Sequence, residues 1–137
     1  AVHIDGGFGT GVASAGKTMG RNWQIIWFSA KSPDTGCLNL RAHMWNEMRN
    51  WLKSGACIPN DDILHTDLIG PEIKPRLDGK IQLEAKEDMK RRGIPSPNRA
   101  DALALTFAMP VIGKDPKGIS HQNKPAQHDF DPYQGVS

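Results

Sequence analysis

The order of apolar and small-residue segments in the first thirty residues restricts the fold more than any other feature of the sequence. AVHID, residues 1 to 5, is a short apolar run that ends in an acid and continues into the flexible GGFGTG. Residues 11 to 19 are small and compatible with a helix, and Gly20 can end it. WQIIWFSA, residues 23 to 30, is uncharged and rich in aromatic and β-branched residues, as in a strand covered by helices. Strand, helix and strand in this order predict a βαβ unit with parallel strands, and therefore an α/β fold.

Helical periodicity is clearest in residues 38 to 54. The apolar residues of this segment recur at helical spacing and predict a face that joins the core, whereas Arg41 and the other polar residues lie mainly elsewhere on the helix. The apolar set consists of Leu40, Met44, Trp45, Met48, Trp51 and Leu52.

Turn and capping residues divide the next part of the chain into short elements. Asn60 or Asp61 starts a short helix that ends at Gly70. The Asp78-Gly79 pair between two alternating segments predicts a β-hairpin. KEDMKRRG predicts a short basic helix, and RADALALTFAM predicts a last helix with one apolar face.

The size and composition of the chain limit its domain organisation. With 137 residues, 38% of them hydrophobic, it is expected to form one globular domain. No run approaches the ~18 apolar residues that cross a bilayer, and no signal-peptide pattern is found, which predicts a cytoplasmic protein without membrane contact. The domain is expected to cover residues 1 to 109, and residues 110 to 137, rich in proline and glycine, predict a flexible tail.

The cysteines do not follow a known metal-binding pattern. Cys37 and Cys57 are the only two, and neither is part of a C-x-x-C pair with histidines at zinc spacing. Both are predicted to be reduced, structural thiols.

GVASAGKT, residues 11 to 18, matches the nucleotide-binding pattern G-x-x-x-x-G-K-[ST]. In a P-loop the buried strand runs directly into the first glycine, whereas here the strand ends near Asp5, well before Gly11. The later strand WQIIWFSAK also ends without the acid that organises Mg²⁺ in such ATPases. Small residues suit a helix packed closely on a sheet equally well, so the sequence disfavours nucleotide binding by Gly16, Lys17 and Thr18.

Two acids are candidates for a catalytic site. Asp5 stands at the carboxyl end of a predicted central strand, where open α/β sheets place their sites, although an Asx-turn acid that starts the next helix fits equally well. Asp101 lies in the first turn of the last helix, either as an ordinary helix-start residue or as a partner for Asp5. Two carboxylates that converge on Mg²⁺ or Mn²⁺ suit phosphodiester hydrolysis by two-metal catalysis.

Three segments, in this order, carry a resemblance to a known family. HIDGGFGTGV, RAHMWNEMRNWLKSGACIPND and GKIQLEAKEDMKRRGIPSPNRADALALTFA resemble the C-terminal nuclease domain of the large terminase subunit of tailed phages and prophages. The resemblance runs from about residue 1 to 109. It implies an RNase H-like fold of the RuvC type, with a mixed sheet flanked by helices, and a metal-dependent endonuclease that cuts concatemeric phage DNA during packaging.

The resemblance also implies three catalytic acids that bind Mg²⁺ or Mn²⁺, two of which match Asp5 and Asp101. Because the family's first acid lies on an upstream strand, the chain is expected to begin at the fourth strand, with an incomplete metal site and uncertain activity by itself. Glu84 is a conceivable substitute ligand but is expected to be an ordinary surface carboxylate. The implied partners are double-stranded phage DNA, the portal protein and the small terminase subunit, in the cytoplasm of a bacterial host.

The segment from Lys74 to Arg99 carries eight basic and four acidic residues. By itself this composition favours a solvated helix face with pairs such as Glu87 with Arg91. The resemblance implies a DNA path with salt-sensitive, sequence-independent contacts instead. The residues expected to line it are Lys86, Lys90, Arg91, Arg92 and Arg99. The alternative to an endonuclease is a non-catalytic remnant that binds DNA or the portal through this face and the tail.

Overall fold

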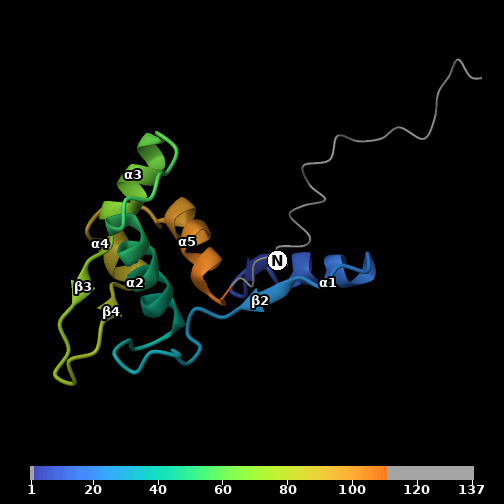
Figure 1. Cartoon of the computed structure of the whole chain (residues 1–137), viewed down its shortest axis with the longest axis horizontal. Coiled ribbons are helices and arrows are strands. Elements are labelled where there is room, and N and C mark those ends of the chain that lie inside the picture. The colour runs from blue at the N-terminus through green and yellow to red at the C-terminus, as the bar shows by residue number, and fades with distance from the viewer. Residues whose placement is uncertain (1, 111–137) are drawn as a thin grey trace, which may run out of the picture.

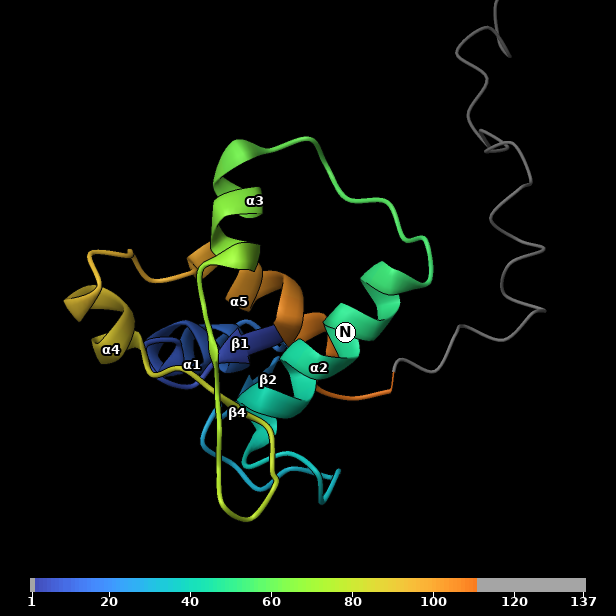
Figure 2. The ribbon, with the colours of Figure 1, turned by 90° about the vertical axis from the view of Figure 1, so that its left-hand side faces the viewer.

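The computed structural model describes residues 2–110, which form a βαβ unit and a larger group of helices with a hairpin (Figure 1). In chain order the elements are β1 (His3–Asp5), α1 (Thr10–Thr18), β2 (Gln24–Ile26), α2 (Leu40–Lys53), α3 (Asp62–Ile69), β3 (Ile73–Lys74), β4 (Gln82–Leu83), α4 (Lys86–Arg91), α5 (Asn98–Ala104) and the 3-10 helix η1 (Leu105–Phe107). Helix α5 lies between the two parts, packed on α2 and α3, and η1 continues from it onto β1 (Figures 1 and 2). The α/β class expected from the sequence is confirmed.

The βαβ unit forms as predicted. β1 and β2 pair in parallel, with His3 opposite Gln24 and Asp5 opposite Ile26, and α1 connects them. β3 and β4 form a separate antiparallel pair, in which Ile73 lies opposite Leu83. Within residues 2–110 the expected mixed sheet therefore consists of two small sheets.

The second strand is shorter than the predicted residues 23 to 30 because the chain turns after Ile26 to meet α2. The carbonyl oxygens of Phe28 and Ala30 accept hydrogen bonds from the N–H groups of Arg41 (3.0 Å) and Leu40 (2.8 Å). These N–H groups lie in the first turn of α2 and have no partner within the helix. The turn thus provides hydrogen-bond acceptors for the first N–H groups of α2, and β2 ends earlier than predicted for this reason.

The prediction that helices cover both faces of this strand is wrong. Ile25 and Trp27, which share one face, are 38% and 51% exposed. The Trp27 ring packs instead over Gly6, where a Cβ atom would lie 2.6 Å from the ring.

Helix α2 supplies three of the seven residues of the buried core cluster, more than any other element. Its N-cap is Asn39, whose side chain accepts a hydrogen bond from the N–H of Ala42 (3.0 Å), and Gly55 follows its end with a φ of +93°. The buried core cluster consists of Ile26, Met44, Trp45, Met48, Leu64, Ala100 and Ala104. Arg41 was predicted to lie off the buried face, but the structure corrects this, since Arg41 is only 8% exposed. The reason is its contact with the buried Asp101, described below.

The shorter elements end where the sequence predicts. The side chain of Asp61 accepts a hydrogen bond from Leu64 N at the start of α3, which selects Asp61 over Asn60 as the cap. Gly79 in the hairpin turn has a φ of +71°, and Gly93 after α4 has a φ of +76°. Positive φ angles of this size favour glycine because it has no Cβ atom that would clash with the backbone.

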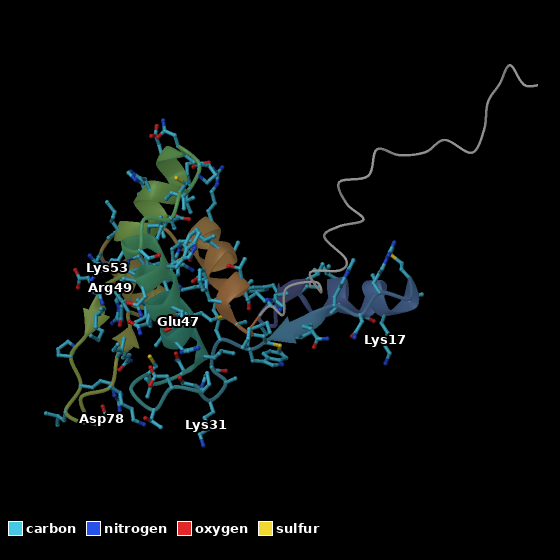
Figure 3. The ribbon with its side chains drawn as sticks, viewed as in Figure 1. Lys17, Lys31, Glu47, Arg49, Lys53 and Asp78 are labelled. Carbon is cyan, nitrogen blue, oxygen red and sulfur yellow. The ribbon has the colours of Figure 1, made fainter. Side chains whose placement is uncertain are left out.

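The segment that matches the nucleotide-binding pattern lies inside α1 (Figure 3, where Lys17 is labelled). From Ala13 onward its N–H groups donate within the helix, starting with Ala13 N to Gly9 O (2.9 Å), so they are not available to cradle phosphates. A Cβ atom at Gly16 would lie 2.3 Å from the Trp23 ring. The small residues therefore serve close packing of α1 on the chain that enters β2.

Two further sequence predictions concern membrane contact and the C-terminal tail. Among residues 2–110 there is no helix with the length and apolar character needed to span a bilayer. Most of the predicted tail, residues 111–137, lies outside the described residues.

Candidate functional site

Asp101 is buried in the first turn of α5, with 4% of its surface exposed. Its Oδ1 atom accepts hydrogen bonds from Trp45 Nε1 (2.9 Å) and from Arg41 Nε (3.2 Å). Both donors come from α2, one helical turn apart, so polar contacts add to the apolar packing between α2 and α5. The orientation of the carboxylate is thereby fixed.

The second oxygen of Asp101 is placed differently. Lys86 Nζ lies 2.9 Å from Oδ2, and this ion pair is the one polar side-chain contact of that buried oxygen among residues 2–110. The Lys86 side chain is 32% exposed, and its ammonium lies 5.5 Å from the centroid of the Phe28 ring, two residues beyond β2. Lys86 therefore links Asp101 to the segment that follows β2.

Arg41 connects the Asp101 carboxylate to the hairpin. Its Nη1 atom donates to the carbonyl oxygen of Glu84 (2.9 Å), and its guanidinium carbon lies 5.8 Å from the centroid of the Trp45 ring. In the described chain the buried Nη2 atom has no hydrogen-bond partner. A buried guanidinium needs a counter-charge, so Arg41 and Asp101 depend on each other.

Asp5 ends β1 and is partly exposed. Its Oδ1 atom accepts a hydrogen bond from Gly7 N (2.9 Å), the Asx turn that the sequence left as an alternative. The main-chain oxygen of Asp5 accepts from Gly9 N (2.8 Å), and a Cβ atom at Gly9 would lie 2.4 Å from that oxygen. This tight turn holds Asp5 at the strand end and engages only one of its carboxylate oxygens.

The strand that carries Asp5 is tied to the helix that carries Asp101. A ring nitrogen of His3, Nδ1, lies 2.8 Å from the carbonyl oxygen of Leu105. His3 and Asp5 are two residues apart and point to the same face of β1. Leu105 follows Asp101 by four residues, about one helical turn.

Glu84 is not the surface carboxylate that was expected, because its exposed fraction is 0%. Arg92 donates to Oε1 through Nε (2.9 Å) and to Oε2 through Nη2 (2.6 Å), and Glu72 N donates to Oε2 (3.2 Å). Lys74 Nζ lies 3.6 Å from Oε1. The hydrogen bonds from Arg92 lower the pKa of Glu84 from 4.5 to about 2. With both oxygens engaged, Glu84 is a structural anchor between the hairpin and α4.

The five predicted DNA-binding residues differ in how far they are engaged. Lys86 pairs with Asp101, Arg92 with Glu84 and Glu72, and Arg99 with Asp61. Arg91 is exposed and pairs with Asp88, not with Glu87 as the sequence suggested. Lys90 is exposed and forms no ion pair within residues 2–110.

The sequence missed the role of Arg41 and Trp45. Trp45 was assigned to the apolar core, and its indole N–H on Asp101 adds a polar role. A signal was present, since Arg41 and Trp45 are four residues apart on one helix and an arginine on a buried face needs a buried acid. Which acid it meets depends on the tertiary arrangement.

The structure is similar to solved nuclease domains of one phage terminase. It matches the nuclease domain of the large terminase subunit gp2 of bacterial virus Sf6 with a TM-score of 0.63 and 23% identity over 80% of this chain. A mutant of that subunit with calcium matches with a TM-score of 0.65, and a mutant nuclease domain with manganese with 0.62, each with 23% identity over 79% of this chain. The chain spans 64% to 65% of the length of these domains.

Sequence comparison adds no further relative, since no protein-family model and no curated protein matches the chain. At 23% identity the structural likeness shows the fold. The chain has the RNase H-like α/β fold of the terminase nuclease domain, as the resemblance implied.

Proposed function

We propose that this chain is part of a metal-dependent DNA endonuclease of a phage packaging terminase, in which Asp5 and Asp101 hold Mg²⁺ or Mn²⁺. The observation that carries the proposal is the buried Oδ2 atom of Asp101, whose one polar side-chain contact among residues 2–110 is the ion pair with the partly exposed Lys86. Structures with the same fold have been solved with calcium and with manganese. Carboxylate oxygens are the ligands that such hard cations prefer.

Two independent contacts support a shared site for the two acids. The His3 contact with Leu105 directs the face of β1 that carries Asp5 toward the α5–η1 helix. The ion pair of Asp101 with Lys86, and the contact of Lys86 with Phe28, link Asp101 to the segment that follows β2, the strand that pairs with β1, which is consistent with a shared site. His3 and Asp5 are roughly 6 Å apart along the strand, and Asp101 and Leu105 are roughly 6 Å apart along the helix. If the helix runs antiparallel to β1, the contact of His3 with Leu105 would therefore bring the carboxylates of Asp5 and Asp101 side by side.

The donor set fits a divalent cation. Asp101 offers Oδ2, and Asp5 offers the oxygen that its Asx turn does not use. Lys86 now supplies a positive charge at Oδ2, and its unbranched, one-third exposed side chain can turn away when another cation takes that place. Arg41 and Trp45 keep hold of Oδ1 during this exchange, as residues behind a metal ligand commonly do.

The chain's own residues would then orient the site and the DNA. Bound divalent ions supply the activated water and the stabilisation of charge on the phosphate. Asp101 remains fixed by Trp45 and Arg41, so its free oxygen keeps one direction. Lys86, if a metal ion displaced it from Oδ2, would remain a cation beside the site that could neutralise a DNA phosphate.

DNA contacts are assigned mainly to Lys90 and Arg91 on α4. Both are exposed, and Arg91 gives up only a surface pair with Asp88, which is worth little. Arg92 and Arg99 would first have to leave Glu84 and Asp61, so they are expected to contribute less. Replacing Lys90 by Gln should weaken binding to any duplex sequence and reduce the salt dependence by about one phosphate contact.

The proposal is tested by nicking of supercoiled plasmid DNA in Mg²⁺ or Mn²⁺. Cleavage should occur with the metal, stop in a chelator, and be lost in Asp5→Asn and in Asp101→Asn. Asp78→Asn is the matched control, because Asp78 lies at the exposed hairpin turn (Figure 3) and should leave cleavage unchanged. Cleavage that survives both site substitutions would contradict the assignment.

A second candidate function is DNA binding without cleavage. Arg41 and Lys86 already neutralise Asp101, and exposed Lys90 and Arg91 remain available to a phosphate backbone. Salt-sensitive duplex binding by a chain that does not nick DNA in any divalent metal would favour this function over the first.

A further inference from the structure

We propose that Asp34, Cys37 and His43 form a Zn²⁺ site that is distinct from the Asp5 and Asp101 site. One ligand atom of each of the three side chains lies within 4.8 Å of the other two. In residues 2–110 no other group of three or more His, Cys, Asp or Glu side chains converges in this way. A thiol, an imidazole and a carboxylate are the ligand types that zinc combines in proteins.

The site lies on a different face of α2 from Asp101. His43 is two residues from both Arg41 and Trp45, which places its side chain about 200° around the helix from theirs. Asp34 and Cys37 come from the loop between β2 and α2. A metal bound there would not share ligands with the carboxylates assigned to DNA cleavage.

The spacing of the ligand atoms suits a tetrahedral ion. Bonds of about 2.0–2.3 Å from zinc to nitrogen, oxygen and sulfur place neighbouring ligand atoms about 3.5 Å apart. Cys37 Sγ lies 3.8 Å from Asp34 Oδ2, close to that separation. The other pairs of ligand atoms lie within 4.8 Å, so side-chain shifts of about 1 Å would bring all three ligands into range.

The loop that carries two of the ligands is held in place. Gly36 N donates to Asp34 Oδ1 (2.8 Å), which leaves Oδ2 toward the Cys37 thiol. The main chain of Ile81 forms a hydrogen bond on each side of Cys37: its N–H donates to Gly36 O (2.8 Å), and its carbonyl oxygen accepts from Leu38 N (2.9 Å). The loop therefore presents its ligands without needing the metal to order it.

Among residues 2–110, Asp34 Oδ2, Cys37 Sγ and His43 Nδ1 form no hydrogen bond outside the cluster. His43 Nδ1 is buried and has no hydrogen-bond partner within the described chain. Burial, and then the nearby charge of Asp34, raise the pKa of Cys37, so the thiol is protonated at neutral pH. On binding, the S–H bond breaks, an S–Zn bond forms and the proton leaves to solvent, with no change of oxidation state.

Solvent can reach two of the three ligands, Asp34 and His43, whereas Cys37 is buried. Asp34 is exposed, and together with His43 and Glu47 it lines a surface hollow of about 580 Å³. Glu47 lies one helical turn after His43 on α2 (Figure 3) and adds a negative charge beside the thiol. Three protein ligands leave a fourth position, which water or the Glu47 carboxylate can fill.

The test uses Co²⁺ as a spectroscopic substitute for Zn²⁺, added to the full chain under reducing conditions. One equivalent should bind and produce a sulfur-to-cobalt charge-transfer band and the visible bands of a tetrahedral site, both abolished by Zn²⁺ in competition. Cys37→Ser should remove the charge-transfer band, whereas Cys57→Ser, which replaces the exposed cysteine, should retain it. No band in the wild-type chain, or an equal band in Cys37→Ser, would overturn the proposal.

A second variant guards against loss of folding in Cys37→Ser. Asp34→Asn keeps the oxygen that accepts from Gly36 N and changes an exposed residue, so the fold should persist by circular dichroism. It should weaken Co²⁺ binding by at least about tenfold, the loss seen even for residues behind a metal ligand. Unchanged Co²⁺ affinity in Asp34→Asn would remove Asp34 from the site and overturn the three-ligand assignment.

Discussion

Replacing Trp45 by Phe tests the hydrogen bond that fixes Asp101. The change keeps most of the buried ring but removes the N–H that donates to Asp101 Oδ1 over 2.9 Å. A hydrogen bond to a charged group contributes about 1.5–3 kcal/mol, and the smaller ring loses about 1 kcal/mol of burial and packing. We therefore expect the free energy of unfolding to fall by about 2.5–4 kcal/mol.

Trp51→Phe on the same helix is the matched control. Trp51 is 36% exposed, and its contact is a tilted ring pair with Phe107, 5.6 Å between centroids, with no indole hydrogen bond among residues 2–110. The same change of atoms there should cost about 1 kcal/mol or less. The difference between the two variants, about 1.5–3 kcal/mol, isolates the hydrogen bond to Asp101.

Urea unfolding followed by far-UV circular dichroism measures both variants without relying on tryptophan fluorescence. For a folded region of this size the Trp45 variant should also melt on the order of 10 °C below the Trp51 variant. Equal losses of stability in the two variants would refute the reasoning that the indole N–H of Trp45 holds the carboxylate.

Two further predictions concern α1 and the buried carboxylate Glu84. Gly11→Ala should stabilise the protein by about 0.5 kcal/mol because alanine favours helices and its Cβ would meet nothing within 4 Å. Gly16→Ala should instead destabilise it by about 1 kcal/mol, because crowding of the new Cβ atom against Trp23 costs more than the gain in helix propensity. Urea unfolding measures both variants, and midpoints of Gly11→Ala and Gly16→Ala that shift in the same direction would contradict this prediction. For Glu84, a folded pKa of about 2 against an ordinary 4.5 means that its ionised form stabilises the protein above about pH 4.5 and that this stabilisation is lost as the pH falls toward 2. The gap in urea midpoint between the wild-type chain and Glu84→Gln should therefore shrink over that range, and a gap independent of pH would refute the role of Arg92.

Local patterns predicted most of the elements. The βαβ unit, the long helix over residues 38 to 54, the cap at Asp61 and the turns at Gly79 and Gly93 all form where their residues indicated. These features depend on periodicity and on backbone angles, which neighbouring residues determine. The resemblance added the RNase H-like architecture, which periodicity alone did not supply.

The misplaced residues are those whose surroundings come from distant parts of the chain. Glu84 is buried because Arg92 and the main chain of Glu72 meet it, and Arg41 is buried because Asp101 lies on a helix sixty residues away in the sequence. A charged residue is normally predicted to be exposed. Only the tertiary fold shows where an oppositely charged or hydrogen-bonding group compensates for its burial. The cluster around Cys37 was missed because its spacing follows no common zinc pattern.

The central claim, that Asp5 and Asp101 share divalent ions, is tested most directly by Mn²⁺ titration of the ¹⁵N-labelled chain. Paramagnetic broadening should affect the amides of Gly6 and Gly7, next to Asp5, together with that of Ala102, next to Asp101, at the same Mn²⁺ concentration. Asp5→Asn or Asp101→Asn alone should abolish the broadening at both places. Broadening at only one of the two acids, or broadening that either substitution leaves intact at the other, would contradict a shared site.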